Sequence, residues 1–80
     1  MKKLNDYQKQ EIREAVALQL MQEVEDIKDD FYLSNLGMDS LDAIELIMEL
    51  EKKYNIDIPD ALAEKVEKVE DIFTCLENCH

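Results

Sequence analysis

The chain has 80 residues, of which 46% are hydrophobic, and its 20 acidic and 9 basic residues give a formal net charge of −11. A chain of this length encloses one modest core, which predicts a single domain over residues 1–80 without room for a deep enzyme cleft. The acidic charge disfavours nucleic acid and anionic membranes as partners, because both attract basic surfaces. No apolar run approaches the roughly 18 residues of a spanning helix, so we expect a cytoplasmic protein without membrane insertion.

The scarcity of turn-forming residues favours helices over a sheet. One glycine and one proline are too few for the many turns of a β-sandwich or barrel. Residues 4–24 place apolar side chains three and four positions apart, which predicts a first amphipathic helix. Asn5 and Gln8 have the spacing of a capping box at the start of this helix. Its apolar residues are Ile12, Ala15, Val16, Leu20 and Val24.

Residues 25–38 break the helical period and are expected to form a long ordered loop. The segment contains Gly37, the single glycine, which allows the chain to turn sharply. Four apolar residues in this loop are expected to attach it to the core. They are Phe31, Tyr32, Leu33 and Leu36.

A second, acidic helix is the clearest element, and Asp39 is its expected N-cap. Its apolar residues recur at helical spacing; they are Leu41, Ile44, Leu46, Ile47, Met48, Leu50 and Tyr54. After an extended connector, a short third helix is expected from Asp60, as its N-cap, to Val66. The same spacing predicts a last helix over residues 69–76. The pattern therefore predicts an all-α four-helix bundle with a long first loop and a short third helix.

Acidic residues concentrate in the middle of the chain. Residues 21–51 hold ten acids and one base, Lys28, which gives this segment a net charge of −9. One interpretation is a solvated face that keeps a small protein soluble. The other is a docking face for basic partners, in which the charge steers the encounter. The charge pattern alone leaves both interpretations open.

Several kinds of chemistry are disfavoured by the residues available. Cys75, Cys79 and His80 lack the second ligand cluster of a structural zinc site, and the cysteines are better explained as small apolar packing residues. A calcium loop starting at Asp26 would need glycine where Phe31 stands. The single histidine is the C-terminal residue, where a catalytic base is poorly positioned. We therefore expect no metal site and no catalytic activity of the chain's own.

Ser40 is the remaining candidate for chemistry. With Asp39 as N-cap, Ser40 falls in the first turn of the acidic helix, beside backbone N–H groups that lack intrahelical partners. A phosphate on this hydroxyl would lie near the positive end of the helix dipole. The alternative is that Asp39 and Ser40 only cap a helix, as these residue types commonly do.

Three strings together resemble the acyl carrier proteins. They are Leu36-Gly37-Met38-Asp39-Ser40-Leu41-Asp42, Glu45-Leu46-Ile47-Met48-Glu49-Leu50-Glu51 and Ile56-Asp57-Ile58-Pro59-Asp60. The resemblance implies a four-helix bundle in which Ser40 accepts 4′-phosphopantetheine from coenzyme A, through a phosphopantetheinyl transferase that uses Mg²⁺. The thiol of the arm would then carry an acyl group as a thioester. A chain without catalytic machinery but with one exposed serine at a helix start fits this role.

The resemblance also implies site residues. Asp39, Gly37 and Leu41 would surround the attachment site at Ser40. Residues implied to dock on acyl-transfer and fatty-acid synthesis enzymes with basic patches are Asp39, Asp42, Ile44, Glu45, Met48 and Glu51, although each could instead be a solvated or core position. Candidates for sheltering a short acyl chain between the helices are Leu46, Leu50, Ile58, Val66 and Phe73. The carrier is expected to act as a monomer.

Some positions depart from the family pattern. Asn35, Lys52 and Ala61 stand where acids are common in the family, which implies a docking face adjusted to a different partner set from that of the general fatty-acid carrier. Lys68 stands where a Thr or Ser cap is common, which weakens the expected start of the last helix. Two alternatives to fatty-acid synthesis stay open. One is a dedicated carrier for polyketide, lipid A-like or aminoacyl thioester chemistry, and the other is an unmodified acidic scaffold module.

Overall fold

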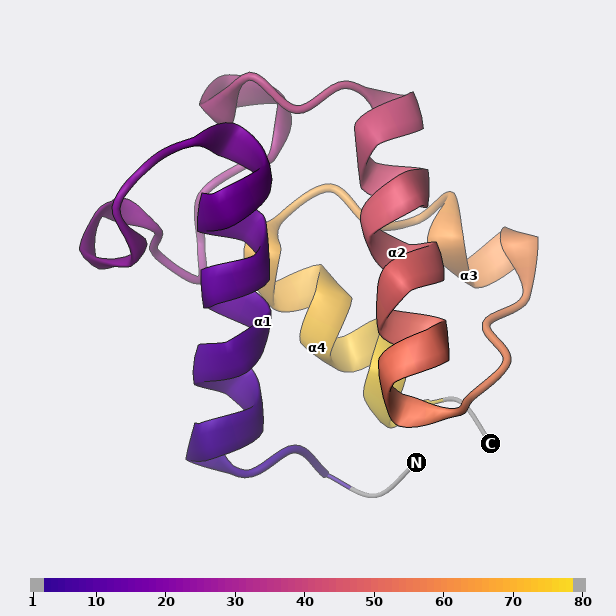
Figure 1. The fold of residues 1–80 in the computed structure, drawn as a ribbon. Coiled ribbons are helices and arrows are strands. Elements are labelled where there is room, and N and C mark those ends of the chain that lie inside the picture. Colours follow the sequence, from indigo (N-terminus) through magenta and orange to yellow (C-terminus); the bar gives the residue numbers. More distant parts are fainter. Residues whose placement is uncertain (1–2, 79–80) are drawn as a thin grey trace.

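The computed structural model describes residues 3–78, which fold into four α-helices around one core (Figure 1). The helices are α1 (Asp6–Leu20), α2 (Ser40–Tyr54), α3 (Asp60–Ala63) and α4 (Val69–Glu77). α1 and α2 run side by side in opposite directions, α4 lies across both, and α3 flanks α2 (Figure 1). The all-α fold, the long first connection and the short third helix are confirmed. None of the described helices is long and apolar enough to cross a membrane.

The start of α1 agrees with the sequence, and its end does not. The Asn5 side chain accepts the Gln8 N–H at 2.8 Å, and the Gln8 side chain accepts the Asn5 N–H at 3.0 Å, which confirms the capping box. The helix was expected to reach residue 24 but ends at Leu20, because Met21 adopts a left-handed conformation with φ of 57°. Val24 instead begins the short 3₁₀ turn Val24–Asp26.

The loop between α1 and α2 is held by backbone pairing. Leu33 is buried and Leu36 packs against the core, as expected, but Phe31 and Tyr32 are 39% and 43% exposed and are not part of the core, so their expected attachment to it is wrong. The Leu33 N–H donates to the Glu67 carbonyl at 2.8 Å, and the Val69 N–H donates to the Phe31 carbonyl at 3.1 Å. These bonds fasten the loop to the segment that leads into α4, so the aromatic rings need not be buried to hold it.

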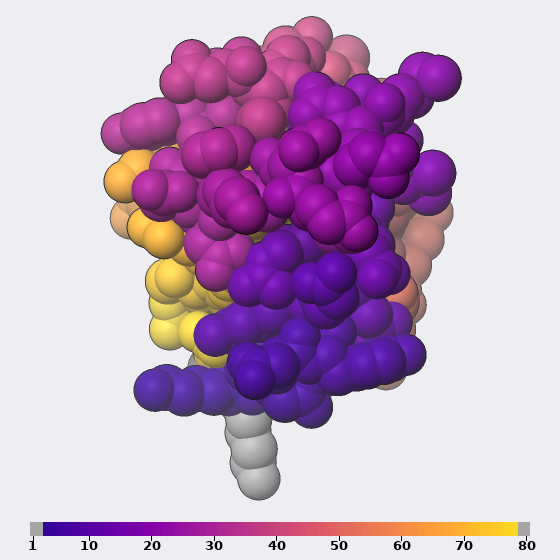
Figure 2. All heavy atoms as spheres, turned by 90° about the vertical axis from the view of Figure 1, so that its left-hand side faces the viewer, coloured from indigo at the N-terminus to yellow at the C-terminus, as the bar shows by residue number. Residues whose placement is uncertain are grey.

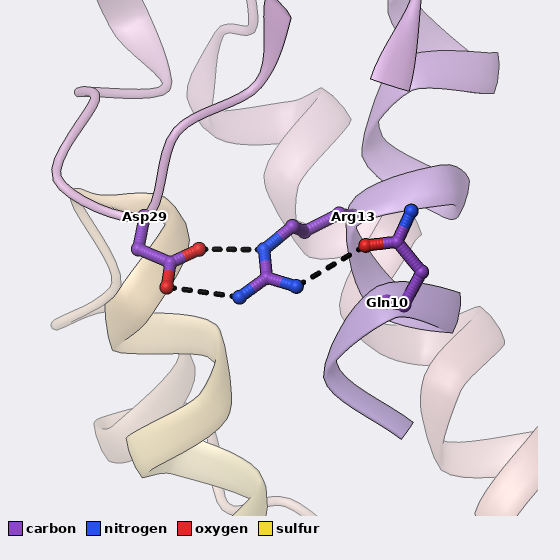
Figure 3. Close-up of polar contacts among 3 residues, drawn as sticks. All are labelled: Gln10, Arg13 and Asp29. Carbon is purple, nitrogen blue, oxygen red and sulfur yellow. Dashed lines mark hydrogen bonds and ion pairs between the residues drawn. The ribbon is translucent and has the colours of Figure 1, made fainter. Parts of the chain in front are cut away.

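An ion pair attaches the same loop to α1. Figure 3 shows the Arg13 guanidinium between the side chains of Gln10 and Asp29. Arg13 Nε lies 2.6 Å from Asp29 Oδ1, and Arg13 Nη2 lies 2.9 Å from Asp29 Oδ2. The guanidinium also lies 5.4 Å from the centre of the Phe73 ring. Figure 2 shows the loop lying against the surface of α1.

This ion pair predicts a pH dependence of stability. The Arg13 hydrogen bond holds the pKa of Asp29 below its ordinary value of 3.8. The stabilisation is therefore fully present above that ordinary value and is lost as the pH falls through the lower pKa of the folded state. We expect Asp29→Asn to reduce the free energy of unfolding by about 0.2–1 kcal/mol at neutral pH, because both partners are partly exposed.

Urea unfolding of wild type and Asp29→Asn at neutral pH and at about pH 3 measures this effect. The difference between the two proteins should shrink in acid. Asp30→Asn is the matched control, because Asp30 is the exposed neighbour of Asp29. A difference that is the same at both pH values would contradict the role of the ion pair.

The later helices begin with different capping arrangements. Asp60 was expected to be the N-cap of α3, but Pro59 occupies that position and its carbonyl accepts the Leu62 N–H at 3.0 Å. α3 ends at Ala63 rather than near Val66, so it is a single turn. α4 starts at Val69 as expected and ends at Glu77, one residue beyond the expected end.

The weak cap at Lys68 is compensated from within α4. The carboxylate of Asp71 accepts the backbone N–H groups of Glu67 and Lys68 at 3.0 and 2.9 Å. Farther along α4, Cys75 is buried, as a packing residue should be, whereas Cys79 and His80 lie outside the described residues. No cluster of metal-ligating side chains occurs within residues 3–78.

Candidate functional site

Ser40 is the first residue of α2, and its side chain is exposed. The Asp39 carboxylate accepts the Asp42 N–H at 2.8 Å, which confirms Asp39 as the N-cap. The Asp42 carboxylate accepts the Asp39 N–H in return at 3.4 Å. Within residues 3–78, the Ser40 hydroxyl has no hydrogen-bond partner. It is therefore accessible to a modifying enzyme, and its modification would break no hydrogen bond within the described residues.

Gly37 produces the turn that brings the chain to α2. Its φ is 95°, in the left-handed region that side chains rarely adopt. It follows the 3₁₀ turn Ser34–Leu36, and its N–H donates to the Ser34 carbonyl at 3.2 Å. A Cβ at this position would meet open space, so the glycine is required for its backbone conformation rather than for room.

Two hollows open beside Ser40. The larger has a volume of about 360 Å³ and is lined by Tyr32, Leu33, Ser34, Met38, Asp39, Ser40, Ala43, Val66 and Glu67. The smaller, of about 130 Å³, is lined by Ser40, Ala43, Ile44, Ala63, Glu64 and Val66. Ser40, Ala43 and Val66 line both hollows. A group attached to the Ser40 hydroxyl could therefore lie along the partly apolar surface of either hollow.

The acids implied for docking differ in how far they are already engaged. Asp39 and Asp42 bond each other's backbone, and Glu51 Oε2 accepts the Ile58 N–H at 2.9 Å, which fixes the connector after α2. Glu45 is exposed and has no hydrogen bond or ion pair among the described residues. Glu49, one turn farther along α2, is equally exposed and unengaged there, and the sequence analysis did not select it.

The apolar residues of α2 separate into two sets. Leu46, Ile47 and Leu50 are buried. The exposed set consists of Leu41, Ile44 and Met48, at 62%, 41% and 52% exposure. Ile44 and Met48 are therefore not ordinary core residues, which leaves their side chains free to contact a partner.

The residues suggested for an acyl-chain shelter also occupy two kinds of position. Val66 is partly buried and lines both hollows beside Ser40. The other four candidates belong to the buried core; they are Leu46, Leu50, Ile58 and Phe73.

Fold and site together define a class: a small helical bundle whose exposed serine starts an acidic helix. A family model described as a phosphopantetheine attachment site matches residues 10–76. The chain is 43% identical over 70 residues to the acyl carrier protein of Campylobacter hominis, covering 86% of this chain and 89% of the relative. It is 44% identical over 68 residues to the acyl carrier protein of Wolinella succinogenes, and this match covers 84% of this chain and 90% of the relative.

The chain therefore belongs to the acyl carrier protein family. Members of this family are carriers rather than enzymes, and their cofactor is covalently attached 4′-phosphopantetheine. When bound, the cofactor supplies a flexible arm whose terminal thiol holds an acyl group as a thioester. The residues present fit this cofactor, because the exposed Ser40 hydroxyl lies beside two open hollows that could receive the arm.

Proposed function

We propose that this protein carries acyl groups for fatty-acid biosynthesis on a 4′-phosphopantetheine arm joined to the Ser40 oxygen. The observation that supports the attachment point is the exposed Ser40 hydroxyl, which starts α2 without a partner among the described residues. The first-turn N–H groups and the helix dipole favour the negative charge of a phosphodiester at this position. Asp39 and Gly37 act indirectly, by setting the start of α2 and the turn before it.

The docking surface proposed for partner enzymes surrounds Ser40 on α2. Leu41, Ile44 and Met48 supply exposed apolar contacts, and Glu45 supplies a carboxylate for lysine or arginine of the partner. An exposed ion pair is worth about 0.2–1 kcal/mol, so such encounters are weak and sensitive to salt. Weak binding suits a carrier that has to leave each partner, including a phosphopantetheinyl transferase and the acyl-transfer enzymes.

Reversing the charge of Glu45 tests this surface. We expect Glu45→Lys to lower the rate of Ser40 loading by a phosphopantetheinyl transferase about two- to tenfold at low salt, with a smaller effect at high salt. The melting temperature should hardly change, because the Glu45 side chain is exposed and makes no hydrogen bond or ion pair with the described residues. Glu70→Lys, an exposed acid on α4, is the matched control. An unchanged rate for Glu45→Lys at low salt would remove Glu45 from the docking surface.

The proposed fatty acyl cargo is tested by measuring which acyl groups are transferred to the phosphopantetheinylated protein. We expect the phosphopantetheinylated form to accept malonyl groups from a fatty-acid malonyl transferase and to pass them to a condensing enzyme of that pathway. Aminoacyl-adenylating enzymes should load it poorly. Efficient aminoacyl loading, or rejection by the fatty-acid enzymes, would favour a dedicated carrier of another pathway.

The protein is proposed to act as a cytoplasmic monomer with residues 1–80 as one domain, in keeping with the single core that its helices share.

A further inference from the structure

The C-terminal end of α1 exposes two large apolar side chains that the core does not use. Leu18 is 81% exposed, and Met21, just after the helix, is 93% exposed. The docking surface proposed above includes neither of them. Large apolar side chains that are this exposed, next to a groove, mark candidate interaction sites.

A groove runs between α1 and α2 next to Leu18. It has a volume of about 350 Å³ and is lined by Ala15, Leu18 and Gln19 of α1 and by Asp42, Glu45 and Glu49 of α2. Two contacts hold the helices on either side of it. Gln19 Nε2 donates to the Asp42 carbonyl at 2.9 Å, and Lys53 Nζ lies 3.0 Å from Glu11 Oε2. Because α1 and α2 are connected at both positions, the groove exists before a partner binds.

The charge of the groove is one-sided. All three residues that α2 contributes are acids, and no basic residue of the described part of the chain lines the groove. The Asp42 carboxylate is engaged with the Asp39 N–H, whereas Glu45 and Glu49 have no described partner. Ala15 and Leu18 of α1, together with the two unengaged carboxylates of α2, are complementary to a segment that combines aliphatic and cationic side chains.

We propose that this groove binds a basic amphipathic helix of a partner protein. An aliphatic side chain of the partner would contact Leu18 and Ala15, and its lysine or arginine side chains would lie against Glu45 and Glu49. Such a helix laid in a groove is a common mode of peptide recognition. The groove lining does not include Ser40, but it shares Glu45 with the docking surface proposed above, so at that residue the inference rests on the proposed function.

The test uses a synthetic helical peptide with leucines on one face and lysines on the other, titrated into isotope-labelled protein and followed by NMR. Backbone shifts should concentrate at Leu18, Gln19, Glu45 and Glu49. Leu18→Ser and Glu49→Lys should each weaken binding about fivefold or more, which corresponds to about 1 kcal/mol. Tyr7→Ser, at the exposed opposite end of α1, and Glu70→Lys, on α4, are the matched controls and should bind normally.

Three results would overturn the proposal: no binding, shifts centred on Ile44 and Ser40 instead, or equal binding of a peptide with the same composition and scattered leucines. The last result would mean attraction by charge alone. The same titration with Ser40→Ala should give the same affinity as wild type. Because Ser40→Ala removes only the attachment site, this titration tests peptide binding in the groove separately from cofactor attachment at Ser40.

Discussion

Leu46→Ala is expected to lower the free energy of unfolding by about 2–5 kcal/mol, the usual cost of removing a fully buried leucine. Leu46 is 1% exposed and belongs to the core shared by the helices. Small domains have total stabilities of about 5–15 kcal/mol, so this loss is a large fraction of the whole. Urea and thermal unfolding followed by circular dichroism measure it.

Leu41→Ala is the matched control on the same helix. Leu41 is 62% exposed, so the same chemical change should alter the free energy of unfolding by less than about 0.5 kcal/mol. The Leu41 variant should instead slow Ser40 loading, because the docking surface includes its side chain. Equal destabilisation by both substitutions would contradict the division of α2 into a buried and an exposed apolar set.

Acyl chains of increasing length on the loaded protein are expected to raise its melting temperature stepwise. Each methylene that leaves water can contribute up to about 0.8 kcal/mol. The smaller hollow beside Ser40 is the proposed entrance, because Ala43, Ile44, Ala63 and Val66 give it an apolar lining. The rise should stop once the chain no longer fits between α2 and α3. Differential scanning calorimetry of a series of saturated acyl forms measures the effect.

A charge at the entrance should abolish this dependence on chain length. Val66→Asp places a carboxylate in the hollow, whereas Lys65→Asp alters the exposed neighbour and serves as its control. The Lys65 variant should keep the stepwise rise, and the Val66 variant should lose it. If no chain length changes the melting temperature of the wild type, the proposed shelter has no support.

The helix starts could be predicted from sequence because short-range hydrogen bonds determine them. Asn5 with Gln8, and Asp39 as the cap of α2, are local arrangements that depend on residues three positions apart. The end of α1 could not be predicted in this way. Its left-handed residue is Met21, where glycine or asparagine would have signalled a helix end.

The exposed and buried apolar residues could not be separated from spacing alone. Ile44 and Met48, four residues apart, fit the helical period as well as Ile47 and Leu50, three residues apart. Only the positions of the other helices decide which pair is buried. The loop around Phe31 is held through its carbonyl, which accepts the Val69 N–H, a bond between residues far apart in sequence. Long-range contacts of this kind leave no periodic signal in the sequence.

The central claim is that Ser40 carries the phosphopantetheine arm, and intact mass spectrometry tests it most directly. Wild type, Ser40→Ala and Ser34→Ala are incubated with coenzyme A, Mg²⁺ and a broad-specificity phosphopantetheinyl transferase. Ser34 is the matched control, because it is the only other serine, is exposed and lines the larger hollow beside Ser40. Wild type and Ser34→Ala should each gain one phosphopantetheine, and a folded Ser40→Ala should gain none. A gain on Ser40→Ala, or none on the wild type, would contradict the assignment.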